Sequence, residues 1–161
     1  MIYRTREFNA KWPDHGISLA YEGELCKMGD LTLSSDPLFR YDALGNLVLA
    51  AIAVLSGFRT CTFGFDEEPG EFRWIVEAID PNTVRVEVRE FEELWGEKPN
   101  SDGKLLFEYN CPSLEFAKAI QSTALAVLEE YGVAGYNKQW AEYPFPERQL
   151  NILGELVATR E

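Results

Sequence analysis

Residues 71–89 read EFRWIVEAIDPNTVRVEVR, and this stretch decides the fold class. Its second half alternates three valines with charged residues, which is the period-two pattern of a strand with one buried face. Its first half alternates in the same way and places on one face Phe72, Trp74, Val76 and Ala78. Because only the turn Asp80-Pro81-Asn82 separates the two halves, they predict neighbouring antiparallel strands.

Two further strands flank this pair. Residues 58–65 precede it across Asp66-Glu67-Glu68-Pro69-Gly70, which is a strong hairpin signal. The alternation changes phase at Glu90-Phe91, so we expect the strand to end or bulge there. Residues 104–109 predict a fourth strand after a loop over residues 98–103. Short links between successive strands indicate an antiparallel meander.

Three segments have helical patterns. Residues 47–55 are apolar on every side, as in a buried helix, with Asp42 as its cap and Gly57 just past its end. A buried strand is the competing interpretation, but the alanines favour a helix. A second helix is expected from Ser113 to Gly132, with one face made of Phe116, Ile120, Ala124, Val127, Leu128 and Tyr131. A third is expected from Pro146, burying Leu150, Leu153, Leu156 and Val157.

The amino-terminal part predicts two more strands, residues 2–8 and residues 17–26, the second with a bulge at Gly23 and a turn over residues 11–16 between them. Strands followed by helices predict an α+β fold, in which helices pack mainly on one face of an antiparallel meander. The length of 161 residues suits one domain over residues 1–161. No apolar leader is visible and the longest apolar run is too short to span a bilayer, so we expect a cytoplasmic protein.

The charge is strongly negative and unevenly distributed. The chain carries a formal net charge of −12, and residues 64–97 hold eleven acids against three arginines, a net charge of −8. Nucleic acids and anionic membranes need a positive surface, so neither is expected as a partner. A basic protein is the charged partner that this composition favours, and a homodimer through an exposed edge strand stays open.

Two acidic clusters are the candidate partner-binding residues, together with Trp95 as an interface anchor; the acids are Asp66, Glu67, Glu68, Glu71, Glu90, Glu92 and Glu93. A plain solvated turn and, with less support, a calcium loop are the other interpretations of residues 66–71. The sequence leaves open whether the two clusters lie together or at opposite ends of the strands.

Catalytic patterns are weak. His15 is the only histidine and reads as a turn residue. Glu22 and Glu24 would share one face of a strand. They could be paired carboxylates like those of a glycosidase, but two exposed glutamates on an edge strand are the more common arrangement. The sequence has no glycine-rich phosphate loop and no C-x-x-C motif. Three widely spaced cysteines, Cys26, Cys61 and Cys111, read as reduced thiols. We therefore expect a non-enzymatic protein with no metal and no cofactor.

The layout resembles the small acidic immunity proteins of bacterial toxin–immunity systems. The resemblance rests on Gly29-Asp30-Leu31 before the apolar helix, on the hairpin Glu67-Glu68-Pro69-Gly70, on the strand-then-helix order of residues 104–131, and on the tail from Trp140 to Leu153. It implies a cytoplasmic binding protein that covers the basic active site of a toxin. The alternative is a small-ligand-binding or adaptor domain, with an apolar pocket between the sheet and residues 113–131.

Overall fold

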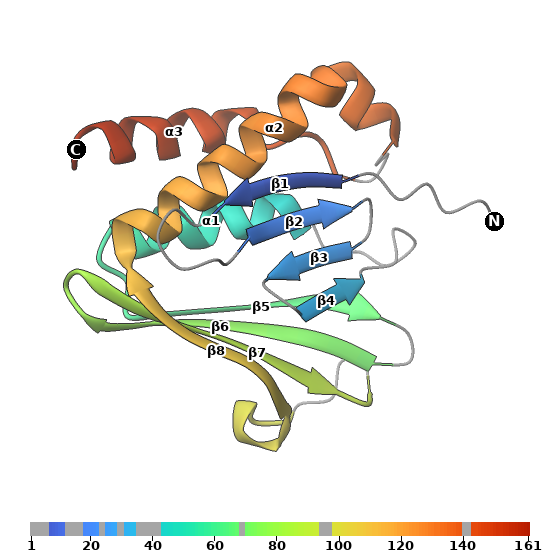
Figure 1. Ribbon diagram of the computed structural model, residues 1–161, viewed down its shortest axis with the longest axis vertical. Coiled ribbons are helices and arrows are strands. Elements are labelled where there is room, and N and C mark those ends of the chain that lie inside the picture. Colours follow the sequence, from blue (N-terminus) through green and yellow to red (C-terminus); the bar gives the residue numbers. More distant parts are fainter. Residues whose placement is uncertain are drawn as a thin grey trace.

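The structure is a computed structural model that describes residues 7–11, 18–22, 25–28, 31–34, 43–67, 70–93, 98–139 and 143–161, with side chains over residues 44–64 and from residue 70 onward within these ranges. It contains antiparallel sheets and three helices, which is an α+β fold (Figure 1). The α+β class predicted from the sequence is therefore confirmed.

The second sheet, β5 to β8, is the meander that the sequence predicts. Its strands are β5 (Thr60–Glu67), β6 (Gly70–Asp80), β7 (Thr83–Phe91) and β8 (Lys104–Pro112). Each pairs antiparallel with the next, and Glu67 pairs with Gly70 across the β5–β6 turn. The fourth strand runs three residues further than residues 104–109, up to Ser113 where a helix begins.

The first sheet pairs β1 (Glu7–Lys11), β2 (Ser18–Glu22), β3 (Leu25–Met28) and β4 (Leu31–Ser34) in sequence order. The prediction of one strand over residues 17–26 is wrong, because the chain reverses between β2 and β3 and Tyr21 pairs with Cys26. The strand β4 carries no predicted counterpart. Of the turn predicted over residues 11–16, Lys11 belongs to β1 instead, and residues 12–16 lie outside the described part of the chain, as do Gly23 and the first six residues. In Figure 1, β1 lies beside the long helix and β4 beside β5.

The helices form where the sequence predicts them. The first, α1 (Ala43–Leu55), ends before Gly57, whose φ of 85° is in the left-handed region that favours glycine. The second, α2 (Ser113–Gln139), is interrupted at Gly132 by a φ of 63° and a ψ of 170°. The predicted end at Gly132 is thus a kink, after which a helical run continues. The third, α3 (Glu147–Ala158), follows Pro146. Within the described residues, no helix combines the length and apolarity needed to cross a bilayer.

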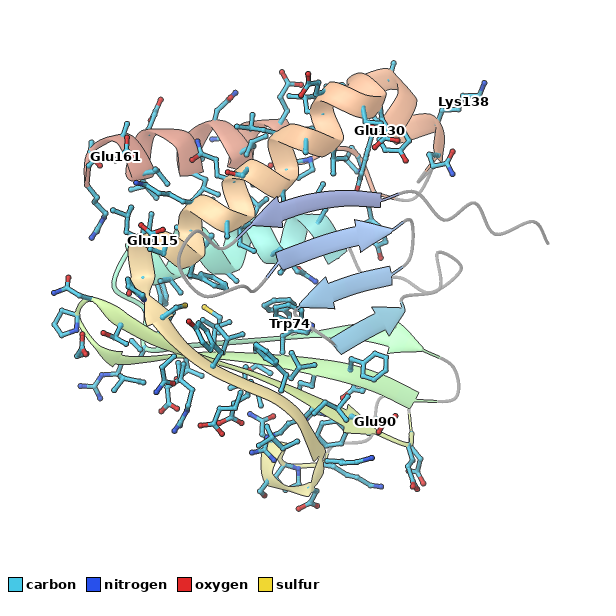
Figure 2. The ribbon with its side chains drawn as sticks, viewed as in Figure 1. Trp74, Glu90, Glu115, Glu130, Lys138 and Glu161 are labelled. Atoms are coloured by element: carbon cyan, nitrogen blue, oxygen red, sulfur yellow. The ribbon has the colours of Figure 1, made fainter. Side chains whose placement is uncertain are left out.

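One core joins the three helices to the inner face of the second sheet, and Figure 1 shows the helices on the same side of β5 to β8. Trp74 of β6 is fully buried there (Figure 2). The ring of Phe63 stacks on it with the centroids 5.8 Å apart. Phe116 of α2 and Leu153 of α3 are fully buried in the same core. Burial of this apolar surface fixes the sheet as a rigid platform. The opposite, outer face carries Glu71, Arg73 and Glu77 of β6 and Arg85, Glu87 and Arg89 of β7.

Candidate protein-binding surface

The three arginines of residues 64–97 all lie on the outer face of the sheet, each beside a glutamate. Arg73 contacts Glu71, Arg85 contacts Glu77, and Arg89 donates from Nε to Glu87 Oε2 at 2.8 Å. Arg85 also approaches Glu87 at 3.3 Å. These pairs match three arginines with three glutamates. The net charge of −8 of this stretch therefore rests on its other eight acids, Asp66, Glu67, Glu68, Asp80, Glu90, Glu92, Glu93 and Glu97.

The strand register brings the two predicted acidic clusters to the same end of the sheet. Asp66 pairs with Glu71, and Glu71 in turn pairs with Phe91, so the end of β5 and the end of β7 flank the start of β6. The backbones are in close contact, because a Cβ placed on Gly70 would come within 2.2 Å of the Phe91 carbonyl oxygen. The two acidic clusters therefore lie together at one end of the strands and not at opposite ends, which the sequence left open.

We call this end the acidic end and define it by Asp66 and Glu67, placed by their backbone, and by the side chains of Glu90, Glu92 and Glu93. Glu92 and Glu93 are exposed, and Glu90 is partly exposed; Figure 2 shows Glu90 at the right-hand end of the lower sheet. Asp80 lies at the opposite end of β6, in the β6–β7 turn, where its carboxylate accepts a hydrogen bond from the Asn82 amide at 2.8 Å. This bond lowers the pKa of Asp80.

Two lysines partly offset the charge of the acidic end. Lys98 Nζ lies 3.7 Å from Glu93 and Lys104 Nζ lies 4.0 Å from Glu90, with every one of these side chains at least 43% exposed. Exposed pairs at such distances contribute about 0–1 kcal/mol and are screened by salt. A partner with a basic surface can therefore displace them at little cost, and the five acids still outnumber the two lysines.

Not all of the predicted residues are available to a partner. Glu71 was predicted as a surface contact, but its residue is only 7% exposed and its carboxylate accepts from Arg73 Nε at 3.0 Å. This burial could not be predicted, because the adjacent acids of the turn suggested one continuous exposed cluster. Glu68 and Trp95 lie outside the residues that the structure describes, as do the side chains of Asp66 and Glu67.

The segment of residues 98–103, which contains a 3-10 turn at Asn100–Asp102, lies against the outer face beside the acidic end. Arg73 Nη1 donates to the Lys98 carbonyl oxygen at 2.8 Å and to Asn100 Oδ1 at 3.0 Å, while Arg89 Nη1 donates to the Gly103 carbonyl oxygen at 3.1 Å. Sequence reasoning assigned residues 98–103 to a plain loop and missed these anchors. Two exposed-looking arginines that alternate with glutamates on neighbouring strands were the only available signal.

Phe91 explains the change of phase predicted at Glu90-Phe91. The strand continues to Phe91 with its alternation intact, so Phe91 lies on the outer face, yet it is buried. The guanidinium carbon of Arg73 lies 3.9 Å from the centroid of its ring, and a Cβ on Gly103 would meet ring atoms at 2.6 Å. The folded-back segment 98–103 therefore supplies a small second core on the charged face. The strand β7 ends at Phe91, as the sequence predicts, and a register irregularity lies just before this end, between β7 and β8 at Val88 and Arg89.

The groups considered for catalysis have little support among the described residues. No cluster of three or more histidine, cysteine or acidic residues in that part of the chain is arranged to hold a metal ion. His15, Glu22, Glu24 and Cys26 have no described side chains. Cys61 and Cys111 are free thiols, and burial raises the pKa of Cys111 to about 12, which keeps it protonated and unreactive at neutral pH.

The alternative function, a small-ligand-binding domain, places a pocket between the second sheet and α2, but this region is occupied by side chains. Between the second sheet and α2 lie Trp74, Phe116 and Ile120, each no more than 1% exposed.

Comparison of the chain with models of protein families, with curated proteins and with solved structures found no match.

Proposed function

We propose that this protein is a non-enzymatic binding protein whose acidic end docks against a basic surface of another protein. The observation that carries the proposal is that Arg73, Arg85 and Arg89 are all paired on the outer face, among the three glutamates Glu71, Glu77 and Glu87. This pairing uses the positive charge of the meander internally. At the acidic end, the described ion pairs of Glu90 and Glu93 are only the exposed lysine contacts, so these carboxylates stay accessible to a partner.

The arrangement suits electrostatic recognition. The acidic end combines a tight hairpin turn with the end of a neighbouring strand, and both are fixed by a packed sheet and not by a flexible tail. Fixed charges of one sign raise association rates with an oppositely charged partner and disfavour partners of like charge. Salt should weaken the interaction, because the acids that carry it are exposed.

Neutralisation of a toxic basic protein is the form of binding that we favour, as the resemblance to small acidic immunity proteins suggests. A toxin that cleaves nucleic acid needs a positive cleft for its substrate. An acidic surface can occupy such a cleft in place of phosphate groups. No chemical step is required of the binding protein.

The experiment is a capture assay at low salt with the tagged protein immobilised. The test variant reverses Glu90, Glu92 and Glu93 to lysine, and the matched control reverses three exposed glutamates elsewhere, Glu129, Glu130 and Glu155. Figure 2 shows that Glu130 lies on α2, far from Glu90, and both variants change the net charge equally. We expect a stoichiometric basic protein to be retained by the wild type and the control and lost by the test variant. Retention by all three, or a partner without a basic surface, would contradict the proposal.

A further inference from the structure

We propose that Arg73 and Arg89 act together as a clamp that holds residues 98–103 on the outer face of the sheet and so fixes the base of the acidic end. They are positioning residues for that surface. The contacts that form the clamp need no partner, whereas its role in recognition rests on the proposed function. The two claims are therefore tested separately.

The first half of the clamp is Arg73. Its guanidinium reaches across to the Lys98 carbonyl oxygen at 2.8 Å and to Asn100 Oδ1 at 3.0 Å. Glu71, two residues earlier on the same strand, holds the other side of the guanidinium through Nε at 3.0 Å. The side chains of Glu71 and Arg73 are only 8% and 14% exposed, so this pair is shielded from solvent and held in one orientation.

The second half repeats the same arrangement on the neighbouring strand. Arg89 Nη1 donates to the Gly103 carbonyl oxygen at 3.1 Å, and Glu87, again two residues earlier, accepts from Arg89 Nε at 2.8 Å. The two arginines, which lie on two different strands, therefore hold opposite ends of the segment by hydrogen bonds. A planar guanidinium can satisfy a carboxylate and a carbonyl at once, which a lysine cannot do with the same geometry.

Between the two arginines, Phe91 fills the space under the segment. Its ring packs below Arg73, and Gly103 lies so close to it that no side chain fits. Phe91 is thus anchored, and Glu92 and Glu93 follow it directly in the chain. Anchoring the residue before these two acids lowers the conformational entropy that they lose when a partner binds.

Arg85 provides an internal control for the clamp. It lies on the same face of β7, four residues before Arg89, and pairs with Glu77 and Glu87. Its side chain is 37% exposed, and among the described residues its hydrogen bond and ion pairs go to Glu77 and Glu87 and not to residues 98–103. Loss of Arg85 removes the same charge from the same strand without touching the segment.

The experiment compares backbone amide order parameters from nitrogen-15 relaxation in Arg73→Met, Arg89→Met and the control Arg85→Met. We expect the amides of Asn100 to Gly103 to fall from about 0.85 to below about 0.6 in the first two variants and to stay unchanged in the control. Fast backbone motion in the folded protein does not change merely because the free energy of unfolding falls, so the readout separates positioning from general stability. Asn100→Ala, which removes only one acceptor of Arg73, covers the case in which Arg73→Met does not fold.

Unchanged order parameters in Arg89→Met and in the folded variant at the Arg73 site would overturn the clamp, and so would an equal loss in Arg85→Met. The role in recognition is measured afterwards with the partner captured by the wild type. Arg89→Met should weaken that binding about tenfold while leaving its salt dependence unchanged, because the acids are still present. If no partner exists, the order parameters still decide the clamp, and the proposed function alone fails.

Discussion

Arg73 on β6 and Arg89 on β7 are directly opposed in the antiparallel register of the sheet. Like charges in this position normally destabilise a strand pair. Here each arginine carries its own glutamate two residues earlier, and both guanidinium groups donate to the same segment of chain. The opposition of two positive charges is therefore compensated by carboxylates and carbonyl oxygens, and it anchors the segment beside the acidic end.

This compensation predicts that Glu71 is far more important for stability than Glu77. Glu71→Gln leaves Arg73 shielded, opposite Arg89 and without its carboxylate, and we expect the free energy of unfolding to fall by about 3 kcal/mol. Glu77→Gln breaks the pair with Arg85, whose side chains are 37% and 44% exposed, and should cost about 0–1 kcal/mol. Urea unfolding of both variants measures the difference. Equal losses would show that the Glu71–Arg73 pair is not specially shielded.

The contact between Gly103 and Phe91 predicts a coupled pair of substitutions. Gly103→Ala drives a Cβ to 2.6 Å from the Phe91 ring, so we expect a loss of about 1–3 kcal/mol in the free energy of unfolding. In a Phe91→Ala background the clash is gone, and the same substitution should cost at least about 0.5 kcal/mol less. A double-mutant cycle by chemical denaturation gives the coupling energy. Strictly additive losses would contradict the contact.

Adjacent positions on α3 predict opposite behaviour. Leu153 is fully buried in the shared core, and Leu153→Ala should lower the free energy of unfolding by about 2–5 kcal/mol through lost burial and a residual cavity. Ile152 is 39% exposed on the same helix, and Ile152→Ala should cost less than about 1 kcal/mol. Thermal and urea unfolding test both. If the two losses are alike, α3 does not pack in the orientation described.

The buried thiol of Cys111 should make the folded protein less stable in alkaline solution. Burial, with a smaller effect from the charge of Glu115, raises the pKa of its thiol from 9.0 to about 12. Between these values the unfolded chain releases a proton that the folded chain keeps, so the stability that the neutral thiol contributes is present below pH 9.0 and is lost as the pH rises toward about 12. Cys111→Ala should flatten the dependence of the unfolding free energy on pH in this window by up to about 1.4 kcal/mol per pH unit. Parallel curves for the wild type and the variant would mean that the thiol ionises alike in both states.

Much of the fold follows from local sequence patterns. The alternation around Val86 and the stripe through Ile120 each reflect one buried face, and the helix before Gly57 is recognised by its continuous apolar run. The strand β4 and the break between β2 and β3 escaped prediction because four-residue strands are too short to show a clear period.

The surface was harder to predict than the core, for a physical reason. Charges alternating along a strand look the same whether they face water or a folded-back segment, so Glu71 and Glu93 read alike in the sequence. What separates them is tertiary structure: Glu71 is buried against Arg73, which donates to the Lys98 carbonyl oxygen and to Asn100, whereas Glu93 is exposed. In the sequence, the change in the apolar–polar alternation at Phe91 was the sign of this second packed layer, and only the tertiary contacts explain it.

The central claim, that the acidic end recognises a basic protein, is tested most directly by the association rate with the captured partner at ionic strengths from about 0.01 M to about 0.15 M. We predict that the wild-type rate falls steeply with salt and that reversal of Glu90, Glu92 and Glu93 to lysine lowers the low-salt rate at least about tenfold. Reversal of Glu129, Glu130 and Glu155 should change that rate much less. An equal loss in both variants, or a wild-type rate that does not depend on salt, would contradict the account.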